Sequence, residues 1–131
     1  MKKFENIIIG FGKGGKTLAG ALAKAGQTVA MVERSDKMYG GTCINVACIP
    51  TKYLENQAAR SEALGGSFED RRERYRKAIE GKRALTSGLR QKNFEKLDVL
   101  DRVEVLTGQG SFVDDHHVQV AMADGSTELL E

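Results

Sequence analysis

Both cysteines of the chain, Cys43 and Cys48, lie in the segment GGTCINVACIPTK, which also holds the only proline, Pro50. Two thiols at this spacing, in a chain with no other cysteine, can bind a metal or form a disulfide. Zinc needs four ligands, and the remaining candidates, His116 and His117, are neighbours on a predicted strand, so their side chains point to opposite faces. The residues therefore favour redox chemistry over a metal site.

A disulfide between Cys43 and Cys48 cannot form within a regular α-helix. Residues at this spacing have Cα atoms about 8 to 9 Å apart in a helix, beyond the roughly 7 Å that a disulfide allows. Gly40 and Gly41 permit unusual backbone angles before Cys43, and Pro50 suits the first turn of a following helix. We therefore predict a distorted helix start that presents both sulfurs on one side, with a helix dipole that lowers the thiol pKa.

A second chemical motif, Gly10-x-Gly12-x-x-Gly15, lies between a predicted strand at residues 4–9 and a predicted helix at residues 16–25. Gly10 permits a tight turn, Gly12 lets a pyrophosphate approach the backbone, and Gly15 lets the helix and strand pack closely. Phosphates would then meet the free N–H groups at the helix N-terminus. The motif predicts a dinucleotide site, although the glycines alone fit FAD and NAD equally.

Glu33 follows a second predicted strand at residues 28–32. Two apolar strands joined by one helix predict a βαβ unit with parallel strands and a right-handed crossover. A carboxylate at the end of the second strand would accept hydrogen bonds from both ribose hydroxyls of an adenosine and would repel a 2′-phosphate. Gly26 stands where the C-terminal cap of the helix is expected.

The remaining pattern predicts two long helices and then a β-meander. Helices are expected at residues 53–64 and 69–97, separated by Gly65-Gly66. From residue 102 the apolar period changes to two, which is typical of short antiparallel strands. These strands are expected at residues 103–106, 111–113, 117–121 and 127–130, with turns at Asp114-Asp115 and, as a type I′ turn, at Asp124-Gly125.

Composition narrows the possible partners and location. The 131 residues are 40% hydrophobic and carry a net charge of +2, which favours neither a nucleic-acid nor a membrane partner. EDRRERYRK is interpreted as a solvated helix face because acidic residues dilute its basic ones. The first residues do not resemble a signal peptide, so we expect a cytoplasmic protein.

The segment from Gly40 to Lys52 closely resembles the redox-active segment of the flavoprotein disulfide reductases, the class I pyridine nucleotide-disulfide oxidoreductases. This family includes dihydrolipoamide dehydrogenase, glutathione reductase and mercuric reductase. The resemblance covers the whole chain and implies FAD as the nucleotide. GFGKGGKTLAG and MYGGTCIN are most similar to bacterial reductases of reactive chlorine stress and hypothiocyanous acid.

The resemblance implies a role for each matched residue. Cys48 would be the charge-transfer thiol beside the flavin, Cys43 the interchange thiol that meets substrate, and Lys52 a residue near flavin N5. Ala47 departs from the family, which usually has glycine before the second cysteine, and its methyl group is expected to crowd the turn.

Three further residues are matched to the cofactor. Gly41 and Thr42 would lie along the FAD, and Gly110 would supply a backbone contact to its adenine end. The implied fold is an incomplete Rossmann-like α/β FAD-binding domain, in which a parallel βαβ sheet is joined by a long helix pair and an antiparallel β-meander.

The resemblance also implies the reaction of the parent protein. Residues 1–131 would be the N-terminal part of an FAD-binding domain, without the NAD(P)H and dimerisation domains. The complete protein would be a homodimer that passes electrons from NAD(P)H through FAD to the Cys43–Cys48 disulfide and on to a small oxidised substrate. The isolated chain is expected to be inactive, to bind FAD weakly and to self-associate. The alternative is a non-catalytic nucleotide-binding or interaction fragment.

Overall fold

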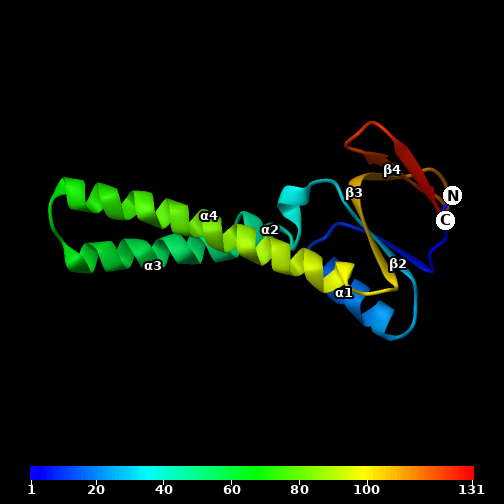
Figure 1. Cartoon of the computed structure of the whole chain (residues 1–131), viewed down its shortest axis with the longest axis horizontal. Helices are drawn as coiled ribbons and strands as arrows, with labels where there is room; N and C mark the ends of the chain where they lie inside the picture. The colour runs from blue at the N-terminus through cyan, green and yellow to red at the C-terminus, as the bar shows by residue number, and fades with distance from the viewer.

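The computed structural model describes all residues from 1 to 131 as a sheet with a long helical arm (Figure 1). One sheet holds five strands in the order β1-β2-β3-β4-β5. The strands are β1 (Asn6–Ile9), β2 (Val29–Glu33), β3 (Val103–Phe112), β4 (Val118–Met122) and β5 (Thr127–Leu130). Because β1 pairs only with β2, its outer edge forms one end of the sheet.

Four α-helices and one 3₁₀ turn connect these strands: α1 (Lys13–Lys24), η1 (Asp36–Met38), α2 (Thr42–Asn45), α3 (Cys48–Leu64) and α4 (Phe68–Asp98). α3 and α4 pack side by side as an antiparallel helical hairpin that projects away from the sheet (Figure 1). Gly65 and Gly66 connect them with positive φ angles, which confirms the predicted break. A capping box between Ser67 and Asp70 starts α4.

The predicted βαβ unit is confirmed. β1 and β2 are parallel, with Asn6 opposite Val29 and Ile9 opposite Val32. α1 begins at Lys13, earlier than predicted, because Gly12 serves as its N-cap and Gly14 and Gly15 lie in the first turn. Gly26 follows the last turn with φ of 90°, as expected for a helix end.

The prediction of short antiparallel strands from residue 103 onward was wrong in one respect. Residues 103–112 form a single strand, β3, whose first half pairs in parallel with β2 and whose second half pairs antiparallel with β4. Gly108 lies where the two halves meet and allows close strand contact, since a Cβ atom there would lie 2.6 Å from the Ala121 carbonyl oxygen.

The β4–β5 connection also differs from the prediction. Gly125 has φ of 85°, but no residue other than glycine has a positive φ, so Asp124 cannot take the type I′ conformation. The Asp124 carboxylate accepts hydrogen bonds from the backbone N–H and hydroxyl of Ser126. This side-chain acceptor stabilises a longer loop in place of the two-residue turn.

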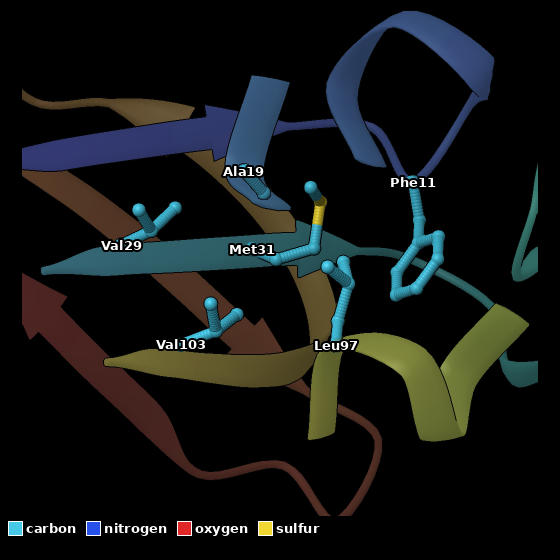
Figure 2. Close-up of a cluster of buried hydrophobic side chains, with 6 residues drawn as sticks. All are labelled: Phe11, Ala19, Val29, Met31, Leu97 and Val103. Atoms are coloured by element: carbon cyan, nitrogen blue, oxygen red, sulfur yellow. The ribbon is translucent and has the colours of Figure 1, made fainter. Parts of the chain in front are cut away.

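The core has two layers because β2 is buried on both faces, as is typical of parallel strands. Val29 and Met31 face α1 and α4, and Figure 2 shows them with Phe11, Ala19, Leu97 and Val103. Ala30 and Val32 face the meander. The meander layer is completed by Leu106, Val118, Val120 and Leu130. These layers fix the end of β2, where Glu33 emerges.

Candidate functional site

The glycine loop leaves the N-terminus of α1 open to a ligand. Gly10 has φ of 108°, and a Cβ atom on Gly15 would lie 2.3 Å from the Gly10 carbonyl oxygen. No side chain caps α1, and nothing lies within 4 Å of where a Cβ of Gly12 would project. The first-turn N–H groups are therefore available to an anion such as a pyrophosphate.

Glu33 lies at the end of β2, as predicted, and its carboxylate reaches back to the glycine loop. Oε2 accepts a hydrogen bond from Phe11 N at 2.9 Å, and Oε1 accepts from Ser35 N at 3.3 Å. Each carboxylate oxygen retains a further acceptor site. The side chain can therefore hold the loop and still accept from a ribose hydroxyl.

A groove connects these features to the meander. Its volume is about 310 Å³. It is lined by Ile9, Gly10, Val32, Glu33, Arg34, Gly108, Gln109 and Gly110. The groove lies at the carboxyl ends of β1 and β2, where ligands bind in open α/β sheets. Glu33 was predicted to contact the ribose and Gly110 the adenine end of the cofactor, and both residues line this one groove.

The cysteine segment has the predicted helix distortion. α2 ends at Asn45, α3 begins at Cys48, and Val46 and Ala47 separate them. Ala47 is exposed and has φ of −116°, so its methyl group needs no left-handed backbone. The expected crowding by this methyl group is therefore wrong. Pro50 is buried within the first turn of α3, as predicted.

The two thiols are free, and Cys48 lies close enough to Cys43 to shift its pKa. Cys43 is half-buried and Cys48 is exposed. The contact with Cys48, together with burial, raises the pKa of Cys43 above its ordinary value. The predicted lowering of the thiol pKa is therefore wrong for Cys43, because proximity of a second thiol outweighs the helix dipole of a four-residue helix.

The glycine loop and the cysteine segment lie against each other. A Cβ atom on Gly41 would lie 2.7 Å from Gly12 Cα and 3.5 Å from Lys13 N, and Gly41 has φ of 84°. Any side chain at Gly41 would push the two segments apart. Thr42 and Cys43 follow directly, so the structure brings the predicted nucleotide and thiol residues together.

Lys52 is the one predicted site residue that the structure leaves outside this cluster. It lies one turn after Cys48 on α3, but its side chain is 80% exposed and forms an ion pair with Glu55 at 3.3 Å. Nothing near the glycine loop contacts it. Its assignment beside the flavin stays a prediction.

Two lysines near Cys43 were missed by the sequence analysis. The positive charge of Lys13 lowers the pKa of Cys43, which partly offsets the contact with Cys48. Lys16 is half-buried, and its amine donates to Asn93 Oδ1 on α4. Burial, with the nearby charges of Lys96 and Lys13, lowers the pKa of Lys16. The sequence signal for both was their position, Lys13 within the phosphate-binding motif and Lys16 directly after it.

His116 and His117 lie in the β3–β4 loop and not on a strand. The prediction that they are strand neighbours whose side chains point to opposite faces was therefore wrong. His117 Nδ1 lies 2.7 Å from Asp114 Oδ1, and Asp114 also accepts from His116 N. No group of three or more His, Cys, Asp or Glu side chains is arranged to hold a metal ion. None of the helices combines the length and apolar character needed to cross a membrane.

Comparison with known proteins gives matches over almost the whole chain. The family model of pyridine nucleotide-disulphide oxidoreductases matches residues 4–129. RclA of Escherichia coli K12, a probable pyridine nucleotide-disulfide oxidoreductase, is 42% identical over 98% of this chain and 27% of its own length. Glutathione reductase of Schizosaccharomyces pombe is 35% identical over 95% of this chain and 28% of its own length.

Solved structures agree with these sequence matches. The Cu(II) complex of the HOCl-induced flavoprotein disulfide reductase RclA from Escherichia coli superposes with a TM-score of 0.85 and 40% identity. This match covers 100% of the chain and 27% of the RclA chain and confirms the predicted Rossmann-like α/β fold. The chain thus spans about a quarter of the length of these relatives. From its sequence and its fold, the chain belongs to the pyridine nucleotide-disulphide oxidoreductase family.

Proposed function

We propose that residues 1–131 form the nucleotide-binding and redox-thiol part of an FAD-dependent NAD(P)H disulfide oxidoreductase. The contact between Gly41 and Gly12 carries this proposal, because it places the cysteine segment directly against the phosphate-binding loop. A nucleotide held by the loop would extend past Thr42 toward the thiols. Membership of a family of flavoproteins that use pyridine nucleotides supports FAD as this nucleotide.

The residues present fit the ADP half of FAD. The pyrophosphate would meet the uncapped N-terminus of α1 above Gly12, and the ribose would hydrogen bond to Glu33. The adenine would enter the groove bounded by Gly110. Bound FAD would supply two-electron transfer from NAD(P)H to the disulfide, and the chain's own contribution is to hold this group and present the thiols.

The two thiols can complete a substrate reduction between them. The Cys43 thiolate attacks an electrophilic sulfur or halogen atom of the oxidised substrate; a bond forms between Cys43 Sγ and that atom while the bond from that atom to its leaving group breaks, and the leaving group departs with the electron pair. The Cys48 thiolate then attacks Cys43 Sγ, which forms the disulfide and releases the substrate with the bonding electron pair. Two electrons leave the thiols, and both thiol protons pass to the products or to water.

The charges near Cys43 suit this role. Its raised pKa keeps the thiol protonated near neutral pH, so a cation is needed to stabilise the thiolate during attack. Lys13 is that cation, since its charge favours the Cys43 thiolate. Lys13 follows Gly12, the residue against which Gly41 packs, so one short turn serves both phosphate binding and thiolate stabilisation.

Cu(II) is a second candidate oxidant for the same thiols. Two solved structures similar to this chain are Cu(II) complexes of RclA, one of them a C43S mutant. Oxidation of both thiols by two Cu(II) ions would give one disulfide, two Cu(I) ions and two protons. Thiolate ligands prefer Cu(I), which favours this direction. A Cu(I)-specific chromophore would measure the product, and Cys43→Ser should prevent its formation.

The isolated chain should bind FAD weakly and show no turnover. Ile9, at the end of β1, is 46% exposed, and an open hollow of about 630 Å³ lies beside β1 and the β3–β4 loop. We propose that the complete protein covers this surface and is a homodimer in a cytoplasmic setting. Without that cover the edge of β1 can pair with another copy, so self-association is expected.

Cysteine variants of the complete polypeptide test the proposed reaction. Cys43→Ser should abolish substrate turnover and leave a flavin that NAD(P)H still reduces, because only the thiol that meets substrate is lost. Ser61→Ala, in the helical arm, is a control that should retain turnover. Retained turnover in Cys43→Ser would overturn the role of Cys43. If the purified complete protein neither contains nor gains flavin, the alternative of a non-catalytic nucleotide-binding or interaction role would be favoured.

A further inference from the structure

The turn that carries Cys43 is held by side chains that lie outside the two motifs. α2 is a single turn, and its last residue, Asn45, closes it: Nδ2 donates to the carbonyl oxygens of Tyr39 and Gly41, each at 2.9 Å. Asn45 therefore ties the end of α2 to the chain that precedes it. This clamp is local and does not by itself orient the turn relative to the rest of the domain.

Arg90 on α4 provides the connection to the rest of the domain. Its Nη1 donates to Asn45 Oδ1 at 3.2 Å and to the carbonyl oxygen of Lys37 at 3.0 Å. One guanidinium group thus reaches both sides of the turn, on η1 and on α2. Hydrogen bonds from a charged donor are stronger than neutral ones, and the planar guanidinium restricts their direction.

α4 is a firm support for this link. It is a helix of 31 residues that starts with a capping box, and its Leu97 belongs to the core beneath β2. Asn93, one turn after Arg90, is buried and lies 3.2 Å from the position that a Cβ of Gly40 would take. The same face of α4 thus contacts the Gly40 turn through Asn93 and the α2 turn through Arg90.

The second thiol is carried by a different element. Cys48 is the first residue of α3, and Val46 and Ala47 form the only covalent link between α3 and α2. The position of Cys43 relative to Cys48 depends on how the α2 turn is held. Neither Arg90 nor Asn45 forms a hydrogen bond with a sulfur, so we expect their influence on the thiols to pass through the orientation of α2.

We propose that Arg90 is a positioning residue that, through Asn45, holds the α2 turn in the orientation from which Cys43 and Cys48 close their disulfide. The inference rests on the proposed redox function of these two cysteines. Without the guanidinium group, water can satisfy the half-exposed acceptors, so the fold should be little affected. The α2 turn would sample more orientations, and closing the disulfide would cost more conformational entropy.

The test measures the disulfide equilibrium in the 131-residue chain. The protein is equilibrated with mixtures of glutathione and glutathione disulfide, quenched with acid and alkylated, and the intramolecular disulfide is quantified by intact mass. In the reaction, one glutathione disulfide becomes two glutathione molecules as Cys43 and Cys48 lose two electrons and two protons. Arg90→Gln should lower the equilibrium constant about threefold to tenfold, which raises the reduction potential by about 15 to 30 mV.

Matched variants separate positioning from general effects. Lys92→Gln removes the same charge from an exposed site two residues away on α4, and its equilibrium constant should equal that of the unmodified chain. Arg90→Lys keeps the charge, but its nitrogen lies one bond closer to the backbone and lacks the planar guanidinium geometry, so weaker contacts with the two acceptors and an intermediate value are expected. In a double-mutant cycle with Asn45→Ala, the Arg90→Gln effect should disappear, because Arg90 acts through Asn45.

The outcomes distinguish the two proposals. An Arg90→Gln chain with the unmodified equilibrium constant, or a Lys92→Gln chain shifted equally, would overturn the positioning role while leaving the redox function intact. Failure of the unmodified chain to form the disulfide would overturn the proposed function and this inference together. If Arg90→Gln lowers helicity or the melting temperature strongly, Arg90→Lys decides: an unmodified equilibrium constant there overturns the role, and an intermediate one supports it.

Discussion

Alanine at Gly15 should destabilise the chain, whereas alanine at Gly20 on the same helix should stabilise it. A Cβ on Gly15 would lie 2.3 Å from the Gly10 carbonyl oxygen and 3.2 Å from Ile8 Cγ2. The first contact is with backbone, so the loop or helix must move by about 1 Å to restore ordinary contact. Nothing lies within 4 Å of the corresponding position on Gly20.

The expected magnitudes follow from two opposing effects. Glycine to alanine within a helix is favourable by about 1 kcal/mol, and this gain is available at both positions. Forcing extra atoms into a tightly packed contact costs about 1 to 3 kcal/mol and exceeds that when backbone must move. We therefore expect the free energy of unfolding to fall by about 1 to 2 kcal/mol for Gly15→Ala and to rise by about 1 kcal/mol for Gly20→Ala.

Thermal unfolding followed by circular dichroism measures both effects. For a chain of 131 residues, the typical unfolding entropy makes 1 kcal/mol equal to about 3 to 4 °C in Tm. Gly15→Ala should melt about 4 to 7 °C lower and Gly20→Ala about 3 °C higher than the unmodified chain. Equal Tm values for the two variants would refute the close packing of strand and helix at Gly15.

Three further predictions concern the helical arm and the thiols. Ser67→Ala removes the side-chain cap of α4 and should lower the free energy of unfolding by about 1 kcal/mol in chemical denaturation; an unchanged midpoint would argue against the capping box. Gly81→Ala would place a Cβ 2.1 Å from the Tyr53 hydroxyl oxygen, so it should lower the Tm. Adding Tyr53→Phe to this variant should restore part of the lost Tm. No restoration would mean that the hydroxyl group does not cause the clash. Cys48→Ala removes the contact that raises the pKa of Cys43. The pH at which alkylation of Cys43 reaches half its maximal rate should therefore fall toward the ordinary pKa near 9.0. An unchanged pH profile would contradict Cys48 as the cause of the raised pKa. In the unmodified chain the folded state keeps Cys43 protonated at pH values above the ordinary pKa. The resulting stabilisation is fully present at pH values below the ordinary pKa and should be lost as the pH rises through the folded pKa. This loss should be smaller in Cys48→Ala.

Local signals predicted the elements that hold the nucleotide motif. The spacing of Gly10, Gly12 and Gly15 between apolar segments indicated the βαβ unit, and Glu33 was expected at the end of its second strand. Each of these features depends on residues close in the chain. The break between Cys43 and Cys48 was likewise predictable, because helix geometry alone excludes a regular helix for a bonded pair.

Features that depend on distant residues could not be predicted in this way. β3 continues through Gly108 because β2 and β4 pair with its two halves, whereas its apolar pattern alone predicted two short strands at residues 103–106 and 111–113. The link from Arg90 to Asn45 joins residues on two helices that are far apart in the sequence. The pKa of Cys43 was misjudged because only the helix dipole was considered, and the contact with Cys48 became evident only from the folded chain.

The absorption spectrum of the complete polypeptide during anaerobic two-electron reduction by NAD(P)H tests the central claim most directly. The claim is that the glycine loop holds FAD with Cys48 beside it and that Cys43 and Cys48 form the redox disulfide. We predict a flavin band that gains long-wavelength absorbance on reduction, as a Cys48 thiolate forms next to oxidised flavin. Cys48→Ser should lose this absorbance. Purified protein without a flavin band, or flavin reduction with no new long-wavelength absorbance, would contradict the account.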